Sequence, residues 1–380
     1  MSPLFSPLFQ PLPGFSTIDI MEKMSAHFSD LSADLAKGAE VFSTLTEDDV
    51  EVASTEKVKV AEFDKVTLYR YQPLEGVETK TDPVLIVYGL IGSYTMIDLQ
   101  EDRSLVRNLL SRGVDLYVVH WGYPSRADQH LKMEDYVCDY LDSCVEHICE
   151  TTQQQALTLF GICEGGVFTT MYTAMYPERV NKLMTSITPI DFAAYTEDQT
   201  LGHGFLNLWI ENLHEEDIDR LLKATGNLSG ELMGAVFQAI TPIRTLTKYN
   251  LDLLNVSSDE SKLLNFFRME KWLADRPHHP AAAAREWLID LYKENKLVKG
   301  NFVLEGKNVD LKNITMPVLN IYAERDHIIP PPCSKSLGKY VGSNDYSELA
   351  IPGGHVGIYV SGKLQGFVGD NIAQWLIERQ

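Results

Sequence analysis

Short apolar runs recur along most of the chain and are separated by segments with helical periodicity. The run 83–89, Pro-Val-Leu-Ile-Val-Tyr-Gly, is continuous and bounded by turn residues, which is typical of a strand buried on both faces. Similar runs occupy 114–120, 156–160, 182–188, 317–322 and 346–351. Helical stretches lie between most of them, at 102–112, 133–151, 167–175 and 334–340. This alternation predicts an α/β fold with a mostly parallel, doubly wound sheet.

A glycine-rich sequence, Gly161-Ile-Cys-Glu-Gly-Gly166, joins one of these strands to the helix that follows it. A Gly-x-nucleophile-x-Gly sequence at a strand-to-helix turn is the nucleophile elbow of the α/β-hydrolase fold. The turn is so tight that side chains at the flanking positions would clash, and the nucleophile adopts a strained backbone conformation. We therefore predict that Cys163 is a nucleophile and that the Glu164 amide, at the helix N-terminus, is an oxyanion donor. The structural alternative is a packing turn that contains a buried cysteine.

A thiol nucleophile needs a base within hydrogen-bond reach and a carboxylate that orients the base. In this fold the chain order is nucleophile, acid, histidine. The next-to-last apolar run is followed by Asp326, and the last run leads into His355. We therefore predict a triad of Cys163, His355 and Asp326. Glu324 is an alternative acid, but Asp326 lies nearer the apex of the loop.

Three further residues are expected close to this triad. The loop after 83–89 supplies the second oxyanion donor in this fold, and by position we assign it to the Ile91 amide. His327 adjoins Asp326 in the chain, so it is expected to support the triad rather than to join it. His120 ends another predicted strand and could also face the site, although a histidine there is more often a satisfied edge residue.

The long segment between 188 and 316 interrupts the strand–helix alternation. It has helical patterns at 217–224, 232–239, 261–274 and 281–297, and it is too long for a simple crossover. We expect a helical cap at 191–305, inserted into an α/β-hydrolase core at 61–190 and 306–380 over the carboxyl edge of the sheet. Residues 1–60 are expected to form an N-terminal helical or docking segment, with an amphipathic helix at 16–42.

Composition excludes several functions. With 33 basic and 53 acidic residues the net charge is −20, which argues against binding to nucleic acid. Five cysteines with no Cys-x-x-Cys pair favour reduced thiols in a cytoplasmic protein. His278 and His279 lack companion ligands at zinc-binding spacing, so no metal site is predicted. The proline-broken N-terminus is no secretory signal, and no apolar run is long enough to predict a membrane span.

Several longer motifs resemble those of the polyhydroxyalkanoate synthases and extend from about residue 60 to the C-terminus. They lie at 98–104, 121–124, 161–166, 188–192, 268–272, 295–300, 320–327 and 354–362. The short chain and the Ile-Cys elbow are similar to the two-subunit, class III type. The sequence departs from the family pattern at 92–95, at His120 and at Glu164, and these positions are expected to line the substrate pocket.

The resemblance implies a cytoplasmic, granule-associated acyltransferase. It would polymerise (R)-3-hydroxyacyl-coenzyme A, above all 3-hydroxybutyryl-coenzyme A, and release coenzyme A without a cofactor. Cys163 would carry the acyl group as a thioester, and His355 would activate Cys163 and then the incoming hydroxyl, unless Asp326 acts on the hydroxyl more directly. The implied partners are a second, non-catalytic subunit and the growing polymer at the granule surface, in a homodimer or hetero-oligomer.

Two other functions stay open on the same residues. The first is a cysteine-dependent hydrolase: a thioesterase, a lactone hydrolase or a polymer depolymerase. The second is a non-catalytic, granule-associated interaction protein built on the same scaffold.

Overall fold

The computed structural model describes residues 46, 48–194, 205–240, 256 and 259–380, so the predicted helix at 16–42 lies outside the described residues. The chain divides into two units. The first unit contains the 3-10 turn η2 (Asp48–Val50) and the beginning of helix α10 (Glu260–Ala274). The side chain of Arg268, in α10, donates a hydrogen bond to the Asp49 carbonyl at 2.6 Å. The second unit spans 52–240 and 270–380 and contains the sheet and the predicted site.

An eight-stranded sheet forms the centre of the second unit, in the order β1-β2-β6-β3-β7-β8-β13-β14. The pairs β1–β2 and β2–β6 are antiparallel, and every pairing from β6 to β14 is parallel. The strands are β1 (Lys57–Phe63), β2 (Val66–Tyr71), β3 (Val84–Val87), β6 (Leu116–His120), β7 (Leu157–Ile162), β8 (Val180–Ser186), β13 (Val318–Ala323) and β14 (Tyr346–Ile351). The predicted mostly parallel, doubly wound sheet is confirmed.

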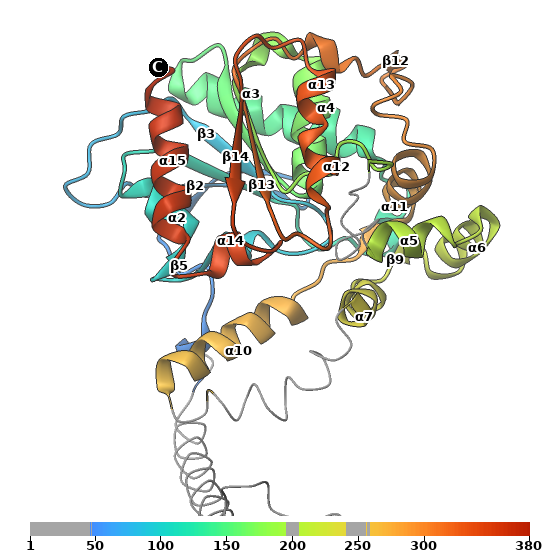
Figure 1. The fold of residues 1–380 in the computed structure, drawn as a ribbon, viewed down its shortest axis with the longest axis horizontal. Helices are drawn as coiled ribbons and strands as arrows, with labels where there is room; N and C mark the ends of the chain where they lie inside the picture. The colour runs from blue at the N-terminus through green and yellow to red at the C-terminus, as the bar shows by residue number, and fades with distance from the viewer. Residues whose placement is uncertain (1–45, 47, 195–204, 241–255, 257–258) are drawn as a thin grey trace, which may run out of the picture. The chain divides into compact units, whose positions relative to one another are not determined.

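Helices cover both faces of this sheet, as Figure 1 shows, with α2 and α15 on one side and α3 and α4 on the other. Every residue of β3 and β7 is therefore buried, whereas the edge strand β14 is mostly half-buried. The helices around the sheet are α2 (Leu105–Leu110), the π-helical η5 (Asp135–Tyr140), α3 (Leu141–Thr152), α4 (Glu164–Met175), α12 (Pro331–Lys335), α13 (Leu337–Tyr340) and α15 (Gln365–Ile377). The elbow thus follows one of the most deeply buried strands.

The segment predicted as a cap contains several of the expected helices. Within the second unit they are α6 (Glu215–Thr225), α7 (Gly230–Ile240), α11 (Ala281–Arg285) and the π-helical η8 (Glu286–Lys293). The helix α5 (Phe205–Glu211) was not predicted. Two short strands that the sequence pattern missed, β9 (Asn227–Leu228) and β10 (His279–Pro280), pair antiparallel and contact α6 and α11. This small ladder includes His279, whereas His278 lies in the loop just before β10.

Shorter elements complete the described chain. They are η3 (Tyr94–Ile97), β4 (Asp98–Gln100), β5 (Arg103–Ser104), η4 (Arg126–Asp128), η6 (Pro177–Arg179), β11 (Val303–Leu304), β12 (Lys307–Asn308), η9 (Leu311–Asn313) and α14 (Gly357–Val360). The helix predicted at 102–112 begins only at Leu105, because the Ser104 side chain caps it by accepting from the Arg107 amide at 2.9 Å.

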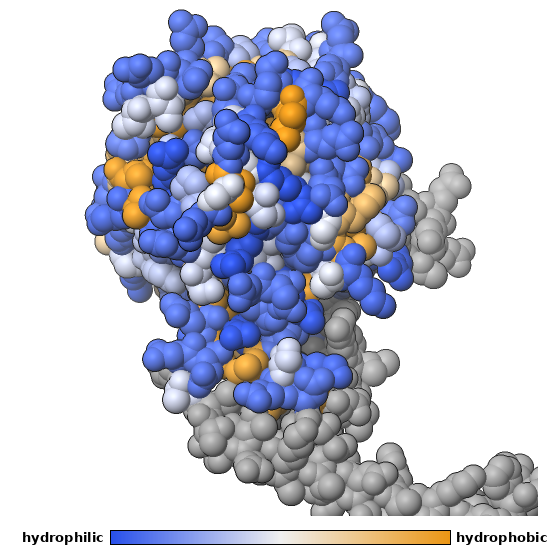
Figure 2. Space-filling model, turned by 90° about the vertical axis from the view of Figure 1, so that its left-hand side faces the viewer, coloured by the Kyte–Doolittle hydropathy of each residue, from blue (hydrophilic) through white to orange (hydrophobic). Residues whose placement is uncertain are grey.

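The coloured surface in Figure 2 is mostly hydrophilic, and its apolar residues form small separate groups. Scattered apolar side chains are normal on a protein surface and identify no particular interface. None of the described helices combines the length and the apolar character that a bilayer span requires.

Candidate active site

Cys163 occupies the turn between β7, which ends at Ile162, and α4, which begins at Glu164. Its backbone has φ 54° and ψ −122°, a combination that non-glycine residues rarely adopt. The Cys163 amide donates to the Ser186 carbonyl at 2.9 Å, and its carbonyl accepts from the Gly166 amide at 3.0 Å. These bonds hold the strained residue in place, so the predicted elbow conformation is confirmed.

Two glycines of the elbow allow the backbones to approach this closely. A Cβ atom at Gly161 would overlap the Thr169 side chain and the Gly166 backbone. A Cβ atom at Gly165 would overlap the Val87 carbonyl oxygen of the neighbouring strand. Any larger residue at either position would push α4 away from the sheet and displace Cys163.

All five cysteines lie in the described part of the chain, and only Cys163 is partly exposed. Burial raises the pKa of Cys138 to about 11 and that of Cys144 and Cys333 to about 12, and it also raises the pKa of Cys149. These four thiols therefore stay protonated at neutral pH and are weak nucleophiles. Cys163 is the thiol that a substrate can reach.

Asp326 and His355 meet because they follow the adjacent parallel strands β13 and β14. The His355 Nδ1–H donates to Asp326 Oδ2 at 2.7 Å. Asp326 is almost fully buried, and its Oδ1 accepts from the Ile328 and Ile329 amides at 2.9 Å each. The backbone thus fixes the carboxylate, and the carboxylate fixes the imidazole.

Cys163 lies at the other side of this imidazole. Burial alone would lower the pKa of His355, but the charge of Asp326, the hydrogen bond to it and a hydrogen bond with Cys163 raise the pKa to about 10. Because Nδ1 is bonded to Asp326, Nε2 is the nitrogen that faces the sulfur. The structure therefore brings together Cys163, His355 and Asp326 in the relative order that a proton transfer from sulfur requires.

The two other candidates in the Asp326 loop lie at the surface. Glu324, the alternative acid, is exposed, and its amide donates to the Ile351 carbonyl at 2.9 Å. His327 is also exposed, although it directly follows the buried Asp326. Among the described residues no cluster of three His, Cys, Asp or Glu side chains could hold a metal ion.

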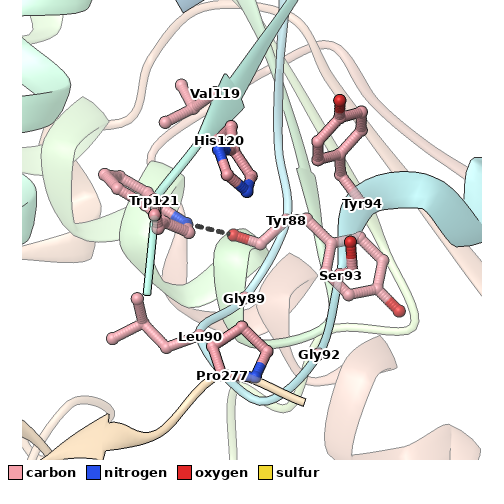
Figure 3. A pocket seen from close by; sticks show the side chains of 11 residues that line it. Tyr88, Gly89, Leu90, Gly92, Ser93, Tyr94, Val119, His120, Trp121 and Pro277 are labelled. Carbon is pink, nitrogen blue, oxygen red and sulfur yellow. Dashed lines mark hydrogen bonds between the residues drawn. The ribbon is translucent and has the colours of Figure 1, made fainter. Parts of the chain in front are cut away.

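A pocket beside the loop after β3 is lined by 88–90, 92–94, 119–122 and Pro277 (Figure 3). The Trp121 indole N–H donates to the Tyr88 carbonyl at 2.7 Å and fixes the start of this loop. His120 points into the pocket, with its ring centroid 5.7 Å from that of Tyr94, and burial lowers its pKa. Most of the positions at which the sequence departs from the family pattern thus line this one pocket, which the triad residues do not line.

The Glu164 side chain makes contacts that sequence reasoning missed. It is almost fully buried, and its Oε2 accepts from the Leu90 amide at 2.7 Å and from the Ile91 amide at 3.2 Å. Its Oε1 accepts from Nε2 of the buried His279, in β10, at 2.7 Å. The Ile91 amide, predicted as an oxyanion donor, is thus occupied by a carboxylate in this structure, whereas the Glu164 amide donates to no described residue.

A strained cysteine after a central parallel strand, with an Asp–His pair after the last two strands of the sheet, is the arrangement of the α/β-hydrolase fold. The sequence pattern of the α/β hydrolase fold matches residues 82–361. A monoglyceride lipase from Saccharomyces cerevisiae has the same fold with a TM-score of 0.54 at 15% identity, over 87% of this chain and 96% of that one. The predicted fold class is confirmed.

Two named proteins narrow the class to a family. The poly(3-hydroxyalkanoate) polymerase subunit PhaC of Synechocystis sp. is 42% identical over 373 residues, which cover 97% of this chain and 96% of that protein. The PhaC subunit of Thiocystis violacea is 40% identical, over 95% of this chain and 99% of that protein. The chain belongs to the poly(3-hydroxyalkanoate) polymerase family of acyltransferases, and the resemblance found in its motifs is confirmed.

Proposed function

We propose that the chain polymerises (R)-3-hydroxyacyl-coenzyme A, with 3-hydroxybutyryl-coenzyme A as the preferred substrate, and that Cys163 carries the acyl group. One observation carries the proposal: the elbow presents a cysteine to the His355–Asp326 pair in a chain 42% identical over 97% of its length to a named polymerase subunit. A thioester on sulfur conserves the energy of the substrate thioester for the next bond.

Acylation begins when the Cys163 thiol gives its proton to His355 Nε2. The sulfur then attacks the thioester carbonyl carbon, the bond from that carbon to the coenzyme A sulfur breaks, and the leaving thiolate takes the proton from His355. Asp326 keeps the imidazole in the tautomer that can accept at Nε2. Because one thioester replaces another, this exchange is nearly balanced in free energy.

The oxyanion of each tetrahedral intermediate is bound by two backbone amides. The Glu164 amide, at the N-terminus of α4, is one donor. The Ile91 amide becomes the second donor once the Glu164 carboxylate releases it, since a carboxylate and an oxyanion cannot share one N–H at close range.

Elongation follows the same path with an alcohol as nucleophile. A 3-hydroxyl gives its proton to His355, its oxygen attacks the acyl carbon on Cys163, and the carbon–sulfur bond breaks with return of the proton to sulfur. An oxoester replaces a thioester, so this step is downhill. Neither step requires a cofactor.

The protein partners follow from the family. The relatives from Synechocystis and Thiocystis are each named as a subunit of the polymerase. We propose that this chain likewise acts with a second, non-catalytic subunit, in an assembly associated with cytoplasmic polymer granules.

The test is incubation of the purified chain with (R)-3-hydroxybutyryl-coenzyme A, with and without the second subunit. Coenzyme A is measured by chromatography, and polymer by methanolysis of the insoluble product. We expect both products, a large rise in rate with the second subunit, and loss of activity in Cys163→Ala. Free 3-hydroxybutyrate without polymer would instead identify a thioesterase, and undiminished activity of Cys163→Ala would remove Cys163 from the mechanism. Full activity of the single chain would exclude the need for a second subunit.

A further inference from the structure

Tyr292, in the cap helix η8, has its ring fixed by two aromatic neighbours. The ring centroids lie 4.5 Å from that of Phe192 and 5.7 Å from that of Trp287, both in edge-on arrangements. Phe192 belongs to the segment that follows β8, where the Ile190 and Asp191 amides both donate to the Cys333 carbonyl. Tyr292 is thereby held at the carboxyl end of the sheet, where the elbow also lies.

Hydrogen bonds fix the backbone of Phe192, the residue that packs against this ring. The Phe192 amide donates to Asn295 Oδ1 at 3.1 Å, and the Phe192 carbonyl accepts from Asn207 Nδ2 at 2.7 Å. The Asn295 side chain also donates to Asp191 Oδ1 at 2.8 Å. These bonds fix the backbone of Phe192, whose ring packs against that of Tyr292.

The hydroxyl of Tyr292 is buried and has no hydrogen-bond partner among the described residues, and only 6% of the residue is exposed. A buried, unpaired hydroxyl destabilises a folded protein by about 1–3 kcal/mol, so its retention calls for an explanation. Burial raises the pKa of Tyr292 well above its usual value, and Cys163, Cys333, Glu164 and Asp326 act in the same direction. The unpaired hydroxyl therefore lies within electrostatic reach of the nucleophile and of the acid.

We propose that the Tyr292 hydroxyl is a specificity-determining group that binds the 3-hydroxyl of the acyl chain carried on Cys163. This inference rests on the proposed function. The 3-oxygen is two carbon atoms from the acyl carbon, so it lies close to the sulfur, and it is the polar atom that distinguishes a 3-hydroxyacyl group from a plain acyl group. A phenol can both donate to and accept from an alcohol. A site built to bond a substrate hydroxyl discriminates strongly against analogues that lack it.

The variant Tyr292→Phe removes a single oxygen and keeps the ring between its aromatic neighbours. The assay is release of coenzyme A in one turnover, from (R)-3-hydroxybutyryl-coenzyme A and from butyryl-coenzyme A. We expect kcat/KM for the 3-hydroxy substrate to fall roughly 10- to 100-fold, with less than about a twofold change for butyryl-coenzyme A. The melting temperature should not fall, because the hydroxyl has no described partner in the free protein.

Tyr71→Phe is the matched control. Tyr71 in β2 is fully buried, and its hydroxyl also has no described partner. Burial and the nearby carboxylate of Asp98 raise its pKa, and no residue of the triad contributes. Both substrates should react at wild-type rates in this variant.

The outcomes separate the two levels of the proposal. If the wild type is acylated but Tyr292→Phe discriminates between the substrates as the wild type does, the role of Tyr292 is overturned and the proposed function stands. Equal losses on both substrates, or a lowered melting temperature, would reduce Tyr292 to a structural residue. If the wild type releases no coenzyme A from either substrate, the proposed function fails and this inference falls with it.

Discussion

The substitution Asp326→Asn keeps the size of the side chain and removes its charge. Asn can still present its oxygen to the Ile328 and Ile329 amides, which donate to Asp326 Oδ1 at 2.9 Å, so the loop should fold as before. Its NH₂ group would then face His355 Nδ1, where the carboxylate now accepts at 2.7 Å. The proton would move to Nε2, the nitrogen that must accept from Cys163, and the base would be lost.

The size of this effect follows from the raised pKa of the His355 imidazole. The pKa of His355 is about 10, against 6.5 for an ordinary histidine, although burial opposes the rise. A difference of about 3.5 corresponds to about 5 kcal/mol in favour of the imidazolium, at 1.36 kcal/mol per pKa unit. Asp326 supplies the leading favourable contributions and Cys163 the remainder. We therefore expect Asp326→Asn to lower the acylation rate by about 10³ to 10⁴, in line with serine triads.

Single-turnover release of coenzyme A from 3-hydroxybutyryl-coenzyme A measures this rate directly. Glu324→Gln is the matched control, because it neutralises an exposed carboxylate two residues earlier in the same loop. We expect Glu324→Gln to react within about twofold of the wild type, as surface charges contribute little. A near-native rate for Asp326→Asn, combined with a large loss in Glu324→Gln, would refute the assignment of the acid.

Three further predictions concern the same site. Iodoacetamide should label Cys163 before the four buried cysteines in peptide mapping, and first labelling of a buried cysteine would contradict its role as the accessible thiol. Glu164→Gln should lower the free energy of unfolding, measured in urea, by about 1–2 kcal/mol, because charge-assisted hydrogen bonds become neutral ones. The acylation rate should not fall, because a neutral side chain releases the Ile91 amide more easily. The ion pair with Asp326 raises the pKa of His355 to about 10. Its contribution to the stability of the fold is therefore fully present below about pH 6.5 and is lost as the pH rises through about 10. Asp326→Asn should accordingly lower the melting temperature most at or below pH 6.5, and a difference that does not shrink toward pH 10 would contradict this origin.

Much of the fold and of the triad could be predicted from the sequence because the causes are local. Continuous apolar runs bounded by turn residues are typical of strands that are covered on both faces, and their alternation with helices predicts a mostly parallel sheet. The elbow needs glycines at fixed offsets from Cys163, since a Cβ atom at Gly161 or Gly165 would overlap the neighbouring backbone. The chain order of nucleophile, acid and histidine then pointed to Asp326 and His355, which the adjacent parallel strands β13 and β14 bring together.

The long-range contacts around the elbow were decided by the tertiary structure alone. His279 reaches Glu164 across 115 residues through the β9–β10 ladder, which is too short to leave a periodic pattern in the sequence. Tyr292 could be assigned to a helix from its surroundings in the chain, but only the structure shows that its ring packs against Phe192 and Trp287 and that its hydroxyl has no described partner. Spacing along the chain determines which backbone shapes are possible, whereas only the packed fold determines which distant side chains share one buried space and whether each polar atom there finds a partner.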